Sequence, residues 1–374
     1  MRIRRFGSRI SLVAATAAIS AGTALLAAPA NAAPDAGQAA PLACPVTDAM
    51  ILAANYWVAH GTDLASTSWQ NGSFYTGNLA VVLATGQSNH RTFPWAQANN
   101  YALGVDPNRP FWPDGQAVGE AYLDLHVYFH PEPENLVPLR EQILAEVASV
   151  EKGHVGYWNY AEAVQRSMPS FARLGVMDGN AAVLEAMHKL FHHAERVAGG
   201  GLFNEVTGLW RHDAFTPVFG ARANGEAFAG LAKVLEALPT TDAHRAEYLR
   251  VFQKMAATIR WTQRQDGFWN VDLLNPWNQP GPESGGTALL AYGVAWGVNH
   301  GVLDPAEYTP VATKAWQALQ SKALGADGLL GYVQKADAKP WDPPGTATET
   351  GAYGVGAFLQ AGRQIALLTP GCHP

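Results

Sequence analysis

Positive charge is scarce in this sequence of 374 residues. Its 25 Lys and Arg residues stand against 31 Asp and Glu, which gives a formal net charge of −6. No cluster of Lys and Arg interrupts this pattern, so nucleic acid and anionic membranes are not expected as partners. Beyond the first 32 residues, no apolar run is long and uniform enough to predict a membrane span.

Several motifs of reaction chemistry are also missing. The sequence contains no HExxH, no CxxC and no G-x-S-x-G, and its glycine run at 199–201 is followed by no phosphate-loop lysine. His192 and His193 are adjacent, which places them on different faces of a helix and predicts surface or packing roles. We therefore expect no metal site.

The first 32 residues have a basic start, an apolar middle of small residues and an Ala-Asn-Ala end. This is the plan of a secretory signal peptide, so we expect a secreted protein and exclude residues 1–32 from the fold. Residues 33–44 read as a short lead-in. No linker divides the rest, and residues 45–374 are predicted to form a single domain.

Cysteine is nearly absent. The only two, Cys44 and Cys372, lie at opposite ends of the mature chain. In an exported protein they favour one disulfide that joins the ends, as a closed ring of elements would allow. Two free thiols are the alternative.

Helical periodicity dominates the remainder. Apolar residues recur at helical spacing in stretches such as 51–59, 141–150 and 226–238, whereas alternating strand patterns are rare. Breakers divide the chain into about twelve helical segments, among them 45–60, 157–175 and 221–237. Paired as hairpins, these segments predict an all-α (α/α)6 barrel, with a less regular helical bundle as the alternative.

Aromatic, Gly-rich segments precede several of these helices. They read SWQNGSFYTG, RPFWPDGQAVG, GLWRHDAF, RQDGFWNVD and GPESGGTA. One such segment alone would indicate core packing, but five at corresponding hairpin ends predict an aromatic-walled pocket at one mouth of the ring. We expect Trp269, in the fourth segment, to shape a sugar site there, with core packing as its alternative role.

Carboxylates in such surroundings are the usual groups for acid–base chemistry on sugars. Each also has an ordinary structural explanation, such as capping a helix. Arg222 is suited to bind a substrate carboxylate, and His212 to bind a sugar hydroxyl or to satisfy a loop. The candidate acids are Asp114, Glu162, Asp213, Asp266, Asp272 and Glu283.

From about Trp57 to Gln364 the chain resembles the unsaturated rhamnogalacturonyl and unsaturated glucuronyl hydrolases, glycoside hydrolase families 105 and 88. The resemblance rests on SWQNGSFYTGNLAVVLATG, DGQAVGEAYLDL, ARANGEAFAGLAKVLEALP and, most specifically, ESGGTALLAYGVAWGVNHGVLDPAEYTPVATKAWQAL. It implies an (α/α)6 barrel and an oligosaccharide substrate that ends in a 4,5-unsaturated uronic acid. The implied reaction is hydration of the C4=C5 double bond, which needs a proton-donating carboxyl and no cofactor.

The resemblance also implies site residues. Glu162 lies seven residues before Pro169, where the family has its catalytic aspartate, and Asp114 precedes Gly119 by the spacing of the second family aspartate. Trp69 and Arg222 match an aromatic and an arginine of the family pocket. His212 lies near a substrate-binding histidine of some members.

Several departures from the family pattern accompany these matches: Glu162 in place of Asp, Gln165 and Arg166 in place of a bulky apolar pair, Ala223 in place of Gly, and Glu226 in place of Trp. A glutamate carries its acid one methylene farther out, and a nearby Arg166 would lower the pKa of Glu162. The departures keep two alternatives open: a barrel that binds oligosaccharides without cleaving them, and a hydrolase of saturated glycosides.

Overall fold

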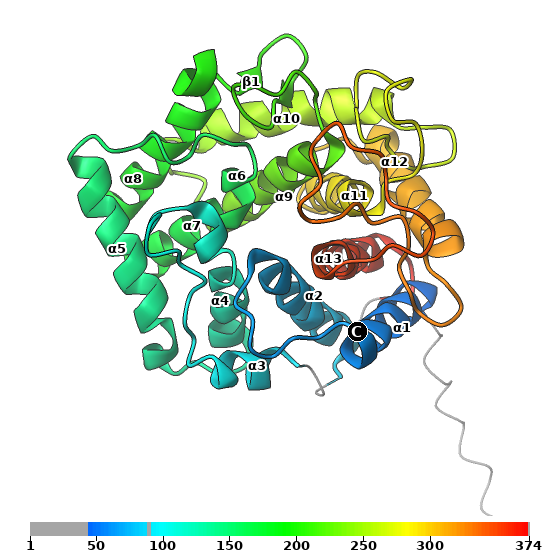
Figure 1. The fold of residues 1–374 in the computed structure, drawn as a ribbon, viewed down its shortest axis with the longest axis horizontal. Helices are drawn as coiled ribbons and strands as arrows, with labels where there is room; N and C mark the ends of the chain where they lie inside the picture. The colour runs from blue at the N-terminus through cyan, green and yellow to red at the C-terminus, as the bar shows by residue number, and fades with distance from the viewer. Residues whose placement is uncertain (1–43, 88–90, 373–374) are drawn as a thin grey trace, which may run out of the picture. The chain divides into compact units, whose positions relative to one another are not determined.

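The computed structural model describes residues 44–87 and 91–372, and the expected signal peptide lies outside these ranges, as does all of the lead-in but Cys44. Six long inner helices form a closed ring, and six further helices surround it (Figure 1). The predicted (α/α)6 barrel is confirmed. The inner helices are α2 (Trp69–Thr85), α4 (Gly119–Tyr128), α7 (Met168–Met177), α9 (Ala221–Ala237), α11 (Ser284–Asn299) and α13 (Ala352–Leu368).

Each inner helix follows an outer one along the chain, which makes six hairpins. The outer helices are α1 (Pro45–His60), α3 (Thr92–Ala98), α5 (Val137–Glu151), α8 (Ala181–His192), α10 (Arg245–Thr262) and α12 (Pro305–Ala318). Short helical turns and one two-stranded sheet complete the described fold. They are η1 (Pro113–Gln116), η2 (Pro133–Leu136), α6 (Ala163–Arg166), η3 (His193–Val197), η4 (Ala198–Gly200), η5 (Leu319–Ala323), β1 (Phe203–Asn204) and β2 (Leu209–Trp210). None of the described helices is both long and apolar enough to cross a bilayer.

The inner helices are rich in Ala and Gly because they pack against neighbours on several sides. In α11, the residues from Ser284 through Gly297 are all buried, as expected of a helix that is apolar around its whole circumference. The ring closes between α2 and α13, where a Cβ on Gly77 would lie only 2.5 Å from the carbonyl oxygen of Gly356. Glycine is required there because the two backbones approach so closely.

The disulfide predicted between Cys44 and Cys372 is present, with the two Cα atoms 5.1 Å apart. It ties the residue before α1 to the segment after α13. The first and last hairpins of the ring are therefore joined covalently as well as by packing.

One predicted helix differs in a way that affects the site. Residues 157–175 were expected to be a single helix, but 157–162 form a loop and the helix is interrupted at Ser167, between α6 and α7. Tyr160 instead pairs with Asp213 in an antiparallel bridge. A long-range backbone pairing thus overrides the local helical periodicity and brings Glu162 to the start of a helix.

Candidate active site

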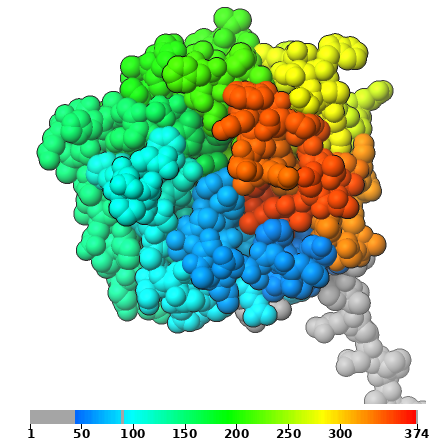
Figure 2. Space-filling model, viewed as in Figure 1, coloured from blue at the N-terminus to red at the C-terminus, as the bar shows by residue number. Residues whose placement is uncertain are grey.

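The candidate site lies at the mouth of the ring where the inner helices begin. The segments that lead into α2, α4, α7 and α9 carry Trp69, Asp114, Glu162 and His212. Parts of the chain coloured blue, cyan, green and orange meet near the centre of one face of the molecule (Figure 2). The structure therefore gathers residues at this mouth that lie far apart in the sequence.

Glu162 and His212 form a closely bonded pair. The Ala161 amide donates to the His212 carbonyl over 2.8 Å, which fixes the two loops side by side. His212 Nδ1 then lies 2.8 and 2.9 Å from the two carboxylate oxygens of Glu162. The Glu162 side chain is only 2% exposed, whereas that of His212 is 26% exposed, so the histidine is the member that faces the open site.

Each member of this pair changes the pKa of the other. Burial raises the pKa of Glu162, but the hydrogen bond and charge of His212, followed by the charge of Arg166, more than offset burial and lower it. Burial lowers the pKa of His212, but the hydrogen bond and charge of Glu162 reverse this and raise it. The predicted effect of Arg166 on Glu162 is present, although His212 contributes more.

Asp114 lies in η1 and is a third exposed. Its Oδ1 accepts a hydrogen bond from the Tyr160 hydroxyl over 2.7 Å and from Arg166 over 2.5 Å. Its Oδ2 has no hydrogen bond to any of the described residues. Trp112 stacks on Tyr160 at 4.6 Å, so one carboxylate oxygen of Asp114 is held and the other is open beside an aromatic wall.

Arg166 and Glu226, two of the departures from the family pattern, bind each other. Arg166 Nε and NH2 donate to the two carboxylate oxygens of Glu226 over 2.9 and 3.2 Å, and both side chains are almost fully buried. The Arg166 guanidinium also lies 3.9 Å from the ring centroid of Trp69. Trp69 thus shapes the site through Arg166 as well as through its own partly exposed ring.

Arg222 lies near Glu162 but has other partners. Its guanidinium donates to the main-chain carbonyls of Lys335, Ala336 and Ala338 over 2.9 to 3.3 Å. This holds the loop before α13 against the start of α9. Beside Glu162 and Arg222, and under Pro340 of that loop, the enclosed space is about 10 Å³, room for about one water molecule.

Trp269 requires a correction. Its ring is fully buried, and its indole N–H donates to the Ile259 carbonyl over 2.9 Å. It therefore packs in the core between the end of α10 and the start of α11 and is not exposed to a sugar. The aromatic, Gly-rich composition of its segment did not distinguish the two roles, because a segment that buries its tryptophan in a tight loop can have the same composition as one that lines a pocket.

The remaining candidate acids have structural partners. Glu283 caps α11 and accepts from the Gly285 and Gly286 amides over 2.9 and 2.5 Å. Asp266 forms ion pairs with Arg264 and Lys322. Asp213 and Asp272 accept backbone amides in their own turns; Asp213 also lies 3.6 Å from His212 Nε2, so it remains at the edge of the site.

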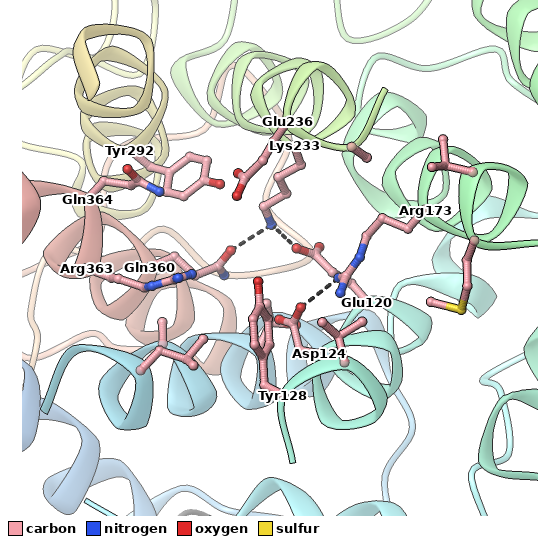
Figure 3. A pocket seen from close by; sticks show the side chains of 17 residues that line it. Glu120, Asp124, Tyr128, Arg173, Lys233, Glu236, Tyr292, Gln360, Arg363 and Gln364 are labelled. Carbon is pink, nitrogen blue, oxygen red and sulfur yellow. Dashed lines mark hydrogen bonds and ion pairs between the residues drawn. The ribbon is translucent and has the colours of Figure 1, made fainter. Parts of the chain in front are cut away.

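A cavity of about 390 Å³ lies at the other mouth of the ring, among the last turns of the inner helices (Figure 3). Its charged groups largely neutralise one another: Lys233 contacts Glu120 and Gln360, and Arg173 contacts Asp124. None of the predicted site residues lines it. Since the predicted site residues lie at the opposite mouth, we do not place the reaction there.

The structure brings the predicted site residues Asp114, Glu162 and His212 to one mouth of the ring. The sequence analysis missed the pairing role of Tyr160 and the partnership of Arg166 with Glu226. Both charges were noted as departures, yet they are 60 residues apart. A signal did exist, since two opposite charges that both replace apolar family residues indicate a compensating pair.

Comparison with known proteins gives concordant results. A model of the family described as Glycosyl Hydrolase Family 88 matches residues 45–368. A protein of Alteromonas sp. (strain LOR) named unsaturated 3S-rhamnoglycuronyl hydrolase is 27% identical over 327 residues, which are 79% of this chain and 77% of that protein.

Two solved structures share the fold. A family 88 glycosyl hydrolase from Bacteroides vulgatus is 28% identical, with a TM-score of 0.78 over 86% of this chain and 97% of that one. A structure named as a polysaccharide lyase is 30% identical, with a TM-score of 0.78 over 86% of this chain and 96% of that one.

Proposed function

The chain belongs to glycosyl hydrolase family 88, and from that premise we propose that it removes a 4,5-unsaturated uronic acid from the non-reducing end of an oligosaccharide. The observation that carries this proposal is the Glu162–His212 pair, in which a buried carboxylate holds a partly exposed imidazole. The Alteromonas relative, named for a reaction on unsaturated rhamnoglycuronyl groups, supports the choice of substrate class.

The pair supplies the proton. With the pKa of Glu162 lowered and that of His212 raised, the proton that the two groups share is favoured on His212. Delivery of this proton to C4 uses the π electrons of the C4=C5 bond and leaves positive charge at C5, next to the ring oxygen. Glu162, which sequence reasoning named as the acid, then acts by holding His212 in its charged form and orientation.

Asp114 acts as the general base for the water that adds at C5. Its open Oδ2 can accept the proton that the water loses, while Tyr160 and Arg166 hold Oδ1. The product is a hemiketal at C5. Its ring opening breaks the bond between C5 and the ring oxygen and leaves a ketone at C5 and a hemiacetal at C1, and breakdown of that hemiacetal to an aldehyde releases the neighbouring sugar. Trp69 and Trp112 provide aromatic surfaces for the sugar rings on either side.

Purified protein is incubated with oligosaccharides made by a polysaccharide lyase, and the ultraviolet absorbance of the C4=C5 bond is followed. Loss of the absorbance with release of the terminal residue supports the proposal. Binding without any loss across several unsaturated substrates would establish a binding protein instead.

A second function is favoured by the 30% identity to a structure named as a polysaccharide lyase. Tyr160 beside Asp114 and Arg166 offers a proton-transferring phenol next to a guanidinium, which elimination at C5 of a uronic acid also needs. The same assay separates the two functions. Elimination on a saturated uronide forms the C4=C5 bond and increases the ultraviolet absorbance, whereas hydration of an unsaturated uronide decreases it.

We further propose that the protein is secreted after cleavage behind residue 32. The basic, apolar and Ala-Asn-Ala order of the first residues and the Cys44–Cys372 disulfide support this proposal. N-terminal sequencing of the protein recovered outside its producing cells tests it, with Ala33 expected as the first residue. Retention in the cells with Met1 in place would contradict it.

A further inference from the structure

On the outer wall of the ring, α8 and α10 bring together two histidines and a glutamate. One donor atom from each of His188, His192 and Glu247 lies within 4.8 Å of the other two. Both helices belong to the outer layer, whereas the candidate active site is built at the start of the inner helices (Figure 1). The cluster takes no part in the chemistry described above.

The two histidines share a helix face because they are four residues apart in α8, within the sequence HKLFH. Glu247 approaches from the first turn of α10. Sequence reasoning considered only the adjacent pair His192-His193, which cannot face one ligand together. The spacing that places two histidines on one helix face is the one from His188 to His192.

His188 is held in place before any ligand binds. Its ring stacks on that of His244 with centroids 3.5 Å apart, and the Tyr248 hydroxyl lies 3.3 Å from its Nδ1. His244 is bonded in turn to Glu185 over 3.1 Å. These contacts fix the orientation of the His188 ring before a ligand binds.

The other two members of the cluster differ in their present contacts. His192 is exposed and forms no hydrogen bond to the described residues, so it can turn toward a ligand. Glu247 lies 3.8 Å from His188 Nδ1 and 3.5 Å from Arg196.

We propose that His188, His192 and Glu247 bind a divalent transition metal ion, Zn²⁺ in particular, that cross-links α8 to α10. Two imidazoles and one carboxylate form a donor set that Zn²⁺ accepts, with water in the remaining position. Hard cations such as Mg²⁺ and Ca²⁺ prefer sets made of oxygen alone, so they are not the expected occupants. The ion stabilises the outer wall and does not enter the sugar reaction.

The test uses the untagged full-length protein stripped with a chelator, and Zn²⁺ or Co²⁺ alone as the probe. Calorimetry is expected to show one equivalent of Zn²⁺ bound, and Co²⁺ to give the visible absorption of a nitrogen-ligated ion. At a Zn²⁺ concentration about a hundredfold above Kd, the Tm rises by about 4 °C. His192→Gln and Glu247→Gln each weaken binding by roughly tenfold or more.

His193→Gln is the matched control, because it removes a histidine from the next position without touching the cluster. Retention of Zn²⁺ binding in His193→Gln, together with its loss in His192→Gln, supports the site. No saturable binding to the parent protein, or equal affinity in the parent and His192→Gln proteins, overturns it. Circular dichroism of each variant without metal verifies that any loss of binding is not a loss of fold.

Discussion

The charge on His212 depends on an almost fully buried carboxylate. Among the described residues the Glu162 side chain bonds only to His212, so in the proposed mechanism its influence on the reaction passes through the pKa of His212. As in other general acid–base pairs, a carboxylate in this position orients the imidazole and stabilises its charged form. Substitution of Glu162 is therefore expected to change the pH profile as well as the rate.

Glu162→Gln gives the first prediction. In the parent protein, activity that needs a proton on His212 falls as pH rises through its pKa, which lies above the ordinary 6.5. Without the Glu162 charge, burial lowers that pKa by more than the nearby Asp213 charge raises it, so the alkaline limb of kcat/KM shifts to lower pH. The rate at neutral pH falls by roughly a hundredfold or more.

The exposed Glu151→Gln at the end of α5 serves as the control and should leave the profile unchanged. An unaltered alkaline limb in Glu162→Gln would mean that His212 is not the proton donor. Asp114 would then become the leading candidate.

Residue by residue, sequence reasoning was uneven for a physical reason. Glu162 and Asp114 could be predicted as site residues because their spacing to Pro169 and Gly119 is local. Trp269 was misplaced because side-chain direction in an irregular loop is set by the packing of distant elements. Local composition does not contain that information.

At the scale of elements, one arginine joins three of them. Arg166 of α6 binds Glu226 of α9 and Asp114 of η1. Because Arg166 and Glu226 are buried, loss of either partner leaves the other as an uncompensated charge. The pair thus fixes how the segment carrying Glu162 sits against α9.

A double-mutant cycle tests this coupling. Arg166→Met and Glu226→Met are each expected to lower the free energy of unfolding by about 3 kcal/mol or more, and the double variant by less than the sum. The partly exposed pair Arg140–Asp178 provides the comparison, with an expected coupling of at most about 1 kcal/mol. Additive losses at Arg166 and Glu226 in denaturant unfolding would show that the two are not coupled.

The loop before α13 depends on Arg222. Arg222→Met removes the hydrogen bonds to the carbonyls of Lys335, Ala336 and Ala338, so amide hydrogen exchange in residues 335–344 should speed up by roughly tenfold or more. Arg211→Met, which removes similar bonds to Gly199 and Gly201, should leave this loop unchanged. A raised KM with unaltered exchange would instead support the direct contact with substrate that the sequence predicted.

For elements, sequence periodicity predicted most helices to within a few residues but not the break before α6. The helices α1 and α9 match their predicted ranges because their cap and breaker residues lie next to them. The loop at 157–162 does not, since its conformation is decided by pairing with the chain around Asp213. Such pairing is invisible to a local pattern.

At the scale of the whole molecule, the disulfide spans 328 residues. Replacement of both cysteines by serine should lower the free energy of unfolding by about 3–5 kcal/mol, because the unfolded chain is no longer a closed loop. Thermal unfolding with and without a reducing agent measures this. The agent should lower the Tm of the parent protein and leave that of the double serine variant unchanged, and a parent Tm insensitive to reduction would contradict the prediction.

The barrel itself was predictable because ring closure follows from the number and kind of hairpins. The small residues that let α2 approach α13 were visible in the sequence, but their mutual contact was not. The closing contact joins the two ends of the chain, so no short-range pattern reports it.

Because the ring of hairpins is closed, the position of the chain ends within it is arbitrary. A chain whose ends are held together can be opened elsewhere, for example in the exposed turn between α9 and α10 near Asp242, and rejoined by a short linker from Cys372 to Cys44. Such a circular permutant keeps every hairpin and every neighbour while it changes the order in which they leave the ribosome. The fold then depends on the cyclic order of the hairpins. Which hairpin comes first and which comes last in the chain is one choice among several.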